Sequence, residues 1–231
     1  MPLLKEKKLK MSKLVIFDLD GTLVDTLPDI SVALNTALKS CGYEANYSLD
    51  EIKSFIGSGE YLLIKRSLIK FDQTNEDEIK RVRNEYSKYY HEHCNINSLP
   101  YSGIIDELNI LKQNGYQLAV LSNKPHSETT KVVKTYFPTN FFNYVRGGVD
   151  GFPIKPNPLG IKLIFKELNI QDSKDIYYVG DSNVDMETGL NAKLITIGTA
   201  YGYCQKEVLE SYPVYKVIDS PKQLSQIILN T

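Results

Sequence analysis

The sequence predicts a doubly wound α/β fold, in which a mainly parallel, Rossmann-like sheet carries an inserted helical cap domain. Four short runs of aliphatic, β-branched and aromatic residues are continuous rather than alternating, which is typical of strands buried on both faces of a parallel sheet. They cover residues 14–17, 118–121, 176–179 and 194–197. Helical patterns separate the later runs, and strands that alternate with helices indicate this fold class.

The composition fits a globular protein with one large domain, or a domain with an insertion. The length of 231 residues exceeds the common domain size. With 42% hydrophobic and 24% charged residues, the chain is not of the disordered class. Its 27 Lys and Arg residues nearly cancel its 28 Asp and Glu residues, so no overall field attracts nucleic acid or an anionic membrane. We expect neither partner.

Several features bear on where the protein resides. No apolar run approaches the ~18 residues that span a bilayer, and residues 1–12 carry lysines without the apolar segment of a signal peptide. Three cysteines, Cys41, Cys94 and Cys204, are far apart and lack CxxC spacing, which fits reduced thiols. We expect a cytoplasmic monomer or homodimer whose residues 1–12 form a flexible tail.

About a hundred residues separate the first two strands, far more than a simple crossover needs. The intervening segment has helical patterns: a capping box opens a short helix at Ser48, and Asn75 is a second N-cap before a long polar helix that reaches about Cys94. These helices cannot all lie on the sheet. We therefore predict a helical cap over residues 25–97, joined by two linker strands, and a core domain made of residues 1–24 and 98–231.

The core domain should contain further helices. Ile104, Leu108 and Leu111 share a helical face, and Gly115 is a typical helix stop before the second strand. Leu159 and Ile164 belong to a similar face before the third strand, and a last helix over 222–229 closes the chain.

Polar residues follow three of the predicted strands at the point where each strand ends. In an open parallel sheet, ligands bind outside the carboxyl ends of the strands. The preference of polar residues for turns readily explains one such ending. It is a poor explanation for three endings that meet at the same edge of the sheet. The endings are Asp18-Leu19-Asp20-Gly21-Thr22, Ser122-Asn123-Lys124 and Gly180-Asp181-Ser182.

Residues 17–26, with the sequence FDLDGTLVDT, resemble the first motif of the haloacid-dehalogenase-like phosphatase superfamily. Its later motifs follow in order: Ser122-Asn123, then Lys155-Pro156, then residues 180–185. The resemblance covers residues 14 to about 197. Residues 27–30, 56–59 and 155–158 further resemble the phosphoglycolate-phosphatase-like branch. For the first motif alone, an Asx-type turn at Asp20-Gly21 would be the alternative interpretation.

The resemblance implies a Mg²⁺-dependent phosphatase that forms an aspartyl-phosphate. Asp18 is the expected nucleophile and Asp20 the expected general acid and base. Asp18, the backbone carbonyl of Asp20 and Asp181 form the expected Mg²⁺ site, and such an oxygen-rich set suits this hard cation. Asp185 is expected to hold a metal-bound water or support the ligands. Its alternative role is that of an acidic residue in the first turn of a helix.

The second and third motifs supply the expected phosphate-binding groups. Ser122 and Asn123 offer a hydroxyl and an amide to phosphate oxygens. Lys155, whose loop is stiffened by flanking prolines, should neutralise charge on the nucleophile and on the transferring phosphoryl group. A role for Lys124, directly after the second motif, is left open.

In the insertion, residues 57–59 form a glycine loop that is either an anion site or an ordinary turn. Arg66 is expected on an exposed helix face, with a substrate carboxylate as the alternative partner. His91 and His93 diverge by about 200° on a helix, so a shared metal is not expected. His126 is expected to be a capping or surface residue.

The favoured substrate is a small phosphorylated metabolite, with 2-phosphoglycolate first. A sugar-phosphate mutase resembling β-phosphoglucomutase shares the nucleophile and metal, and a pyrophosphatase needs only a different leaving group. A non-catalytic binding protein is a third class, which has no need of the full set of Asp18, Asp20, Ser122, Lys155 and Asp181.

Overall fold

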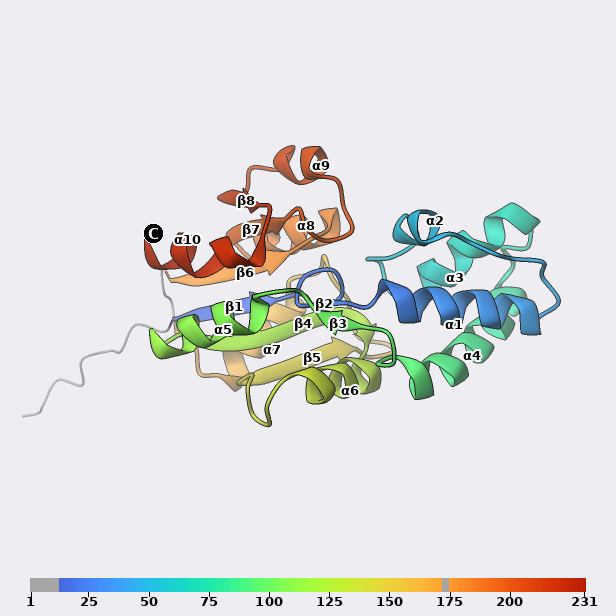
Figure 1. Cartoon of the computed structure of the whole chain (residues 1–231), viewed down its shortest axis with the longest axis horizontal. Coiled ribbons are helices and arrows are strands. Elements are labelled where there is room, and N and C mark those ends of the chain that lie inside the picture. Colours follow the sequence, from blue (N-terminus) through green and yellow to red (C-terminus); the bar gives the residue numbers. More distant parts are fainter. Residues whose placement is uncertain (1–12, 172–174) are drawn as a thin grey trace, which may run out of the picture.

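The computed structural model describes residues 13–171 and 175–231, so the predicted tail over residues 1–12 lies outside the described part (Figure 1). Six strands form one parallel sheet in the order β5-β4-β1-β6-β7-β8. The strands are β1 (Leu14–Phe17), β4 (Gln117–Pro125), β5 (Tyr144–Gly148), β6 (Ile176–Gly180), β7 (Ile195–Thr199) and β8 (Lys216–Ile218). The predicted fold class is confirmed.

The four predicted runs correspond to β1, β4, β6 and β7, and these are the inner strands of the sheet. Neither outer strand was predicted from the sequence. β5 has the sequence YVRGG and β8 is only three residues long, and neither gives a continuous apolar run because an outer strand is less completely covered.

The alternating side chains of β1 explain why its run is continuous. Val15 and Phe17 belong to the core cluster that includes residues of α5 (Ile104–Gln113) and α10 (Leu224–Leu229). Leu14 and Ile16 belong to a second cluster with residues of α7 (Leu159–Glu167). All four β1 side chains are fully buried, as expected for a strand covered on both faces.

The remaining core helices are α6 (His126–Tyr136), α8 (Asn183–Asn191) and α9 (Lys206–Glu210). The predicted last helix is divided, because a 3₁₀ turn, η2 (Pro221–Gln223), precedes α10.

Residues 27–93 form a group of helices beyond the carboxyl ends of the strands (Figure 1). They are α1 (Leu27–Ser40), α2 (Leu49–Lys53), α3 (Glu60–Leu68), the 3₁₀ turn η1 (Ile69–Phe71) and α4 (Glu76–His93). The capping box at Ser48 and the Asn75 cap are both confirmed. The two connections to the core pair with each other as antiparallel strands, β2 (Val24–Asp25) and β3 (Leu99–Pro100).

The strand order places a crevice at the carboxyl ends of β1 and β6. From β1 the chain builds outward through β4 and β5 on one side, and then through β6, β7 and β8 on the other. Ligands bind at such a topological switch point in open α/β sheets. Among the described residues, the helices are all too short or too polar to cross a membrane.

Candidate active site

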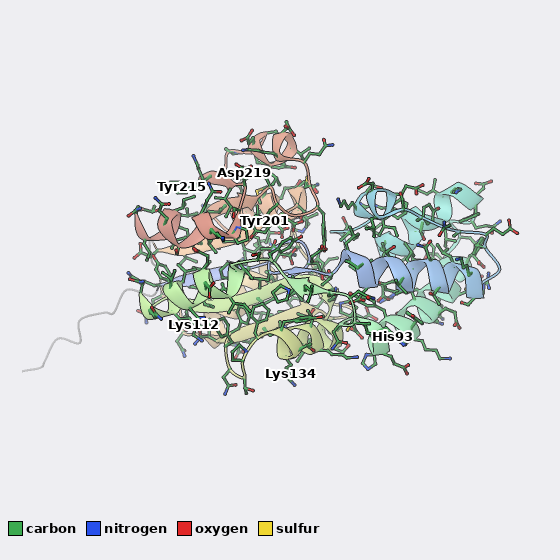
Figure 2. All side chains as sticks on the ribbon, viewed as in Figure 1. His93, Lys112, Lys134, Tyr201, Tyr215 and Asp219 are labelled. Atoms are coloured by element: carbon green, nitrogen blue, oxygen red, sulfur yellow. The ribbon has the colours of Figure 1, made fainter. Side chains whose placement is uncertain are left out.

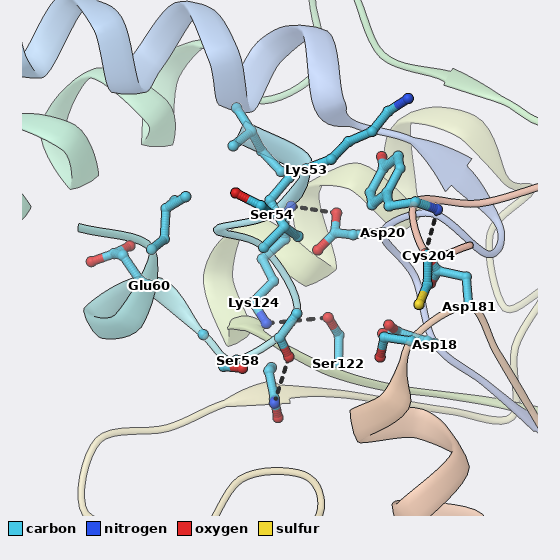
Figure 3. Close-up of a pocket in the computed structure, with 18 of the residues that line it drawn as sticks. Asp18, Asp20, Lys53, Ser54, Ser58, Glu60, Ser122, Lys124, Asp181 and Cys204 are labelled. Atoms are coloured by element: carbon cyan, nitrogen blue, oxygen red, sulfur yellow. Dashed lines mark hydrogen bonds and ion pairs between the residues drawn. The ribbon is translucent and has the colours of Figure 1, made fainter. Parts of the chain in front are cut away.

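A pocket of about 600 Å³ lies between the carboxyl edge of the sheet and the helices of the insertion. Ser54, Ser58 and Glu60 of the insertion lie across it from Asp18 and Asp181 (Figure 3). The sequence-predicted residues that line it are Asp18, Asp20, Ser122, Asn123, Lys155 and Asp181, and Lys124 lines it as well. The structure therefore brings together residues from all four motifs.

The turn after β1 fixes the two carboxylates of the first motif. Leu19 N donates to Asp18 Oδ1 at 2.7 Å, and Gly21 N donates to Val24 O at 2.9 Å. Gly21 has a φ of +81°, and a Cβ there would lie 2.2 Å from Asp181 Oδ2. Only glycine combines this backbone conformation with such a close approach to the carboxylate.

Asp18, Asp181 and Asp185 form a buried carboxylate cluster, in which one oxygen from each lies within 4.8 Å of the others. Burial and the neighbouring Asp185 raise the pKa of Asp18 to about 7, although Lys155 acts in the opposite direction. Burial, Asp185 and Asp18 likewise raise the pKa of Asp181 well above its usual value. Among the described residues, the ammonium of Lys155 is the one positive charge in contact with this cluster of three buried carboxylates, so negative charge remains to be neutralised. Their oxygens are suitable ligands for a divalent cation.

Asp181 is held by hydrogen bonds to both of its oxygens. The Thr22 hydroxyl donates to Oδ1 at 3.0 Å, and the main-chain N–H of Tyr203 donates to Oδ2 at 2.9 Å. Asp181 follows β6 directly and is 2% exposed, so the strand end and these two donors fix its orientation.

Asp185 has the first-turn position considered for it from the sequence, and its part in metal binding stays a prediction. It forms a capping box with Ser182 at the start of α8. Its Oδ1 also accepts hydrogen bonds from Lys155 Nζ at 2.7 Å and from the Tyr178 hydroxyl at 2.9 Å. The helix cap therefore places a carboxylate against the ammonium of Lys155.

Lys155 lies between two carboxylates, with its Nζ 2.8 Å from Asp18 Oδ1 and 2.7 Å from Asp185 Oδ1. Burial lowers the pKa of Lys155, but Asp18 and Asp185 outweigh it and raise the pKa above its usual value. The amide of Asn123 binds both main-chain groups of Lys155, accepting from N at 2.8 Å and donating to O at 3.1 Å. Asn123 thus supports the lysine loop, and phosphate binding by its amide stays a prediction.

Asp20 pairs with Lys124, the residue that directly follows the second motif. Lys124 Nζ donates to Asp20 Oδ1, which also accepts from the Thr26 hydroxyl at 2.5 Å. Lys124 is 7% exposed, and its Nζ lies 4.9 Å from the centre of the Tyr90 ring of α4. Ser122, two residues before Lys124, is also buried, and its Oγ accepts from Lys124 N at 3.2 Å.

The model of the haloacid dehalogenase-like hydrolase family matches residues 15–199, which span all four motifs. The chain belongs to this family. It is 32% identical over 222 residues to a phosphoglycolate phosphatase of Vibrio vulnificus, covering 94% of this chain and 96% of that protein. It is 34% identical over 228 residues to a phosphoglycolate phosphatase of Haemophilus influenzae, covering 94% and 98%.

Solved structures of similar hydrolases share the whole fold. A crystal structure of a "predicted phosphoglycolate phosphatase" from Haemophilus somnus superposes with a TM-score of 0.84 at 30% identity, covering 95% of this chain and 99% of that one. The haloacid dehalogenase-like assignment therefore extends through both the sheet and the helical insertion.

In this hydrolase, the helical insertion contributes a polar loop to the pocket. Arg66 does not lie on an exposed helix face, so that expectation is wrong. It is half-buried, lines the pocket, and donates to Phe55 O at 2.8 Å and to Ser58 Oγ at 3.2 Å. Its guanidinium therefore holds the loop that precedes α3.

The three histidines lie outside the pocket. His91 Nδ1 lies 2.7 Å from Glu128 Oε1, and His93 stacks on Tyr89 near the end of α4 (Figure 2). His126 begins α6 as an exposed residue, and its Nδ1 accepts from Gly147 N at 3.2 Å.

Two residues that orient carboxylates of the cluster were not predicted from the sequence: Tyr178, which contacts Asp185, and Tyr203, which contacts Asp181. Tyr178 sits in a predicted strand and has no local sign of its contact with Asp185. Tyr203 lies 22 residues after Asp181 in a loop without a motif. Tyr203 reaches Asp181 because the loop after β7 folds back onto the end of β6, whereas Tyr178 and Asp185 are seven residues apart and meet across the turn between β6 and α8.

Proposed function

We propose that this hydrolase is a Mg²⁺-dependent phosphatase of small phosphomonoesters that acts through an aspartyl-phosphate on Asp18, with 2-phosphoglycolate as the favoured substrate. The observation that carries the proposal is the placement of Lys155 between Asp18 and Asp185 at the base of the pocket. A carboxylate attacks a phosphoryl group well only where nearby cations screen the charge.

The metal site that we propose consists of Asp18, Asp181 and the main-chain carbonyl of Asp20, with Asp185 supporting the ligands. The buried carboxylate cluster fits this assignment because its three carboxylates carry more negative charge than the single positive charge of Lys155 can neutralise. Mg²⁺ bound there would supply neutralising charge for the phosphoryl oxygens and for the attacking carboxylate.

In the first step, an oxygen of Asp18 attacks phosphorus, and the bond from phosphorus to the leaving oxygen breaks. Asp20 gives its proton to that leaving oxygen, so the product departs as an alcohol. Ser122 and Lys155 bind phosphoryl oxygens, and Asn123 keeps the lysine loop in place.

In the second step, Asp20 accepts a proton from a water molecule that attacks phosphorus. The bond between phosphorus and Asp18 breaks, which releases phosphate and restores the carboxylate. One phosphoester and one water are consumed, and one alcohol and one phosphate are formed.

The helical insertion, residues 25–97, is the part that we propose as a cap over this chemistry. Its Ser58 and Arg66 line the pocket, where they would meet the leaving group. Closure of such a segment excludes water while the aspartyl-phosphate forms. The similarity to relatives named phosphoglycolate phosphatases supports a substrate whose leaving group is small and bears a carboxylate. A cytoplasmic location and a monomeric or homodimeric state stay predictions.

The test is phosphate release from a panel of small phosphomonoesters, including 2-phosphoglycolate, sugar phosphates and p-nitrophenyl phosphate, each with Mg²⁺ or with EDTA. We expect the highest kcat/KM for 2-phosphoglycolate, and no turnover in EDTA. Isomerisation of a sugar phosphate without phosphate release would instead identify a mutase, and pyrophosphate as the best substrate would identify a pyrophosphatase. Activity that is unaffected by EDTA would contradict the metal requirement.

A further inference from the structure

Tyr203, in the loop after β7, connects the carboxylate cluster to the start of the helical insertion. Its main-chain N–H donates to Asp181 Oδ2 at 2.9 Å. Its hydroxyl accepts from Thr26 N at 2.8 Å and from Leu27 N at 3.0 Å, and donates to Asp25 Oδ1 at 3.1 Å. One residue of the core thus contacts both a proposed metal ligand and the chain that leads into the insertion.

The hydroxyl of Tyr203 replaces the missing cap of α1. Thr26 is the N-cap residue of this helix, but its side chain makes no capping hydrogen bond. The first N–H groups of a helix have no partner within the helix and need one from elsewhere. The tyrosine, 177 positions later in the chain, is the partner of Thr26 N, and Leu27 N is shared between the tyrosine hydroxyl at 3.0 Å and Asp25 Oδ1 at 3.3 Å. The start of α1 is thereby attached to the core domain.

This arrangement leaves the Thr26 side chain for another partner. Its Oγ1 donates to Asp20 Oδ1 at 2.5 Å. Hydrogen bonds therefore connect Asp181 to the main chain of Tyr203, the Tyr203 hydroxyl to the main chain of Thr26, and the Thr26 hydroxyl to Asp20. It joins the residue proposed to bind Mg²⁺ with the residue proposed to protonate the leaving group.

Gly202 allows the loop to come this close. A Cβ at Gly202 would lie 2.3 Å from Asp181 Cβ and 2.4 Å from Gly21 O, so a larger residue would push the loop away. The separation required between non-bonded atoms makes glycine necessary at this position.

A second contact extends the effect of Tyr203 to the return connection. The buried carboxylate of Asp29, in the first turn of α1, accepts from Ile96 N at 3.0 Å, Asn97 N at 2.8 Å and Ser98 N at 2.9 Å. The two connections therefore form one unit, and the contact that holds α1 holds both.

We propose that Tyr203 is a positioning residue, which fixes the start of the insertion so that Thr26 keeps Asp20 directed at the leaving oxygen. The proposal rests on the proposed function, because it gives Asp20 the role of general acid. Its structural part, the attachment of α1 through the tyrosine hydroxyl, can be measured without any substrate.

The test is the variant Tyr203→Phe, which removes only the hydroxyl. An alkyl phosphate such as 2-phosphoglycolate needs a proton on its leaving oxygen, whereas p-nitrophenolate leaves without one. In single-turnover measurements of the first step, we expect the rate to fall about 10-fold for the alkyl phosphate. We expect a change of less than about 2-fold for p-nitrophenyl phosphate, with KM for both substrates nearly unchanged.

Two further variants serve as controls. Tyr212→Phe removes a hydroxyl that donates to Glu187 at 3.1 Å, and we expect wild-type rates with both substrates. Thr26→Val removes the threonine hydroxyl but keeps its N–H, and it should reproduce the substrate-dependent loss of Tyr203→Phe.

Amide hydrogen exchange separates this proposal from the proposed function. In Tyr203→Phe, exchange at Thr26 and Leu27 should become faster, whether or not any phosphate is hydrolysed. Unchanged exchange there, or an equal fall in the first-step rate for both substrates, would overturn the proposal. A wild-type protein that hydrolyses no phosphomonoester would instead refute the proposed function, and the exchange result would still decide whether Tyr203 holds α1.

Discussion

The ammonium of Lys155 lies 2.8 Å from Asp18 Oδ1, and both side chains are buried. The contact brings a residue from the loop after β5 to the end of β1, across a gap of 137 positions. An ammonium at this distance would offset negative charge on the attacking carboxylate and on the phosphoryl group. The same ammonium contacts Asp185 at 2.7 Å, so its removal should affect both activity and stability.

We predict that Lys155→Met lowers kcat by about 100-fold or more, the usual cost of losing one charge-stabilising donor in an active site. It also leaves two buried carboxylates without their cation, which typically costs about 3–5 kcal/mol of unfolding free energy. Phosphate release and urea unfolding in EDTA would measure the two effects. The half-buried Lys206→Met variant, which loses a surface pair with Asp219, is the control. Unfolding free energy equal to wild type in Lys155→Met would contradict the buried pairing.

Asp18→Asn should abolish turnover, because an amide is nearly the same size as a carboxylate but is a poor nucleophile. The variant should nevertheless fold, and without metal it should be more stable than the wild type at pH 8, since it removes one of three clustered negative charges. Phosphate release and thermal unfolding in EDTA would measure this, with the exposed Asp219→Asn as control. Activity at the wild-type level would end the covalent mechanism.

Asp181→Asn should raise the Mg²⁺ concentration needed for half-maximal activity, because a neutral amide oxygen is a weaker ligand than a carboxylate. Loss of a group that merely supports a metal ligand typically costs 10–100-fold in metal affinity, and we expect a shift of at least about 10-fold for Asp181. A Mg²⁺ titration of phosphate release would measure it. A titration midpoint equal to that of the wild type would exclude Asp181 from the metal site.

The stability of the metal-free protein should fall as pH rises from about 4 to about 7. The pKa of Asp18 is raised to about 7 in the fold, from an unfolded value near 3.9. Between these values the folded state binds more protons than the unfolded state, so the free energy of unfolding decreases with pH. The raised pKa of Asp181 acts in the same direction.

Thermal unfolding in EDTA at several pH values would test this dependence, and Asp18→Asn should make the fall shallower. Added Mg²⁺ should stabilise the protein more at pH 8 than at pH 5.5, since at low pH it must displace protons from these carboxylates. Equal stabilisation by Mg²⁺ at both pH values would contradict proton release from the cluster.

The sequence by itself determined the inner part of the fold and the residues of the four motifs. The strands β1, β4, β6 and β7 are buried on both faces, so each gives a continuous apolar run that can be recognised locally. The first motif is equally local, because Asp18, Asp20 and Gly21 are close neighbours in the chain. The capping box at Ser48 was predictable for the same reason.

Only the tertiary structure decided which side chains contact the motif residues. Lys124 pairs with Asp20, Arg66 turns into the pocket, and Tyr203 bridges Asp181 and α1. The outer strands β5 and β8 were also found only in the structure. Lys124 and Tyr203 depend on partners more than a hundred positions away in the case of Asp20 and α1, and 22 positions away in the case of Asp181. Arg66 has partners only 8 and 11 positions away, but they lie in a loop outside its own helix. The outer strands depend on what covers them. A local pattern carries no information about such partners, because folding of the whole chain brings them together.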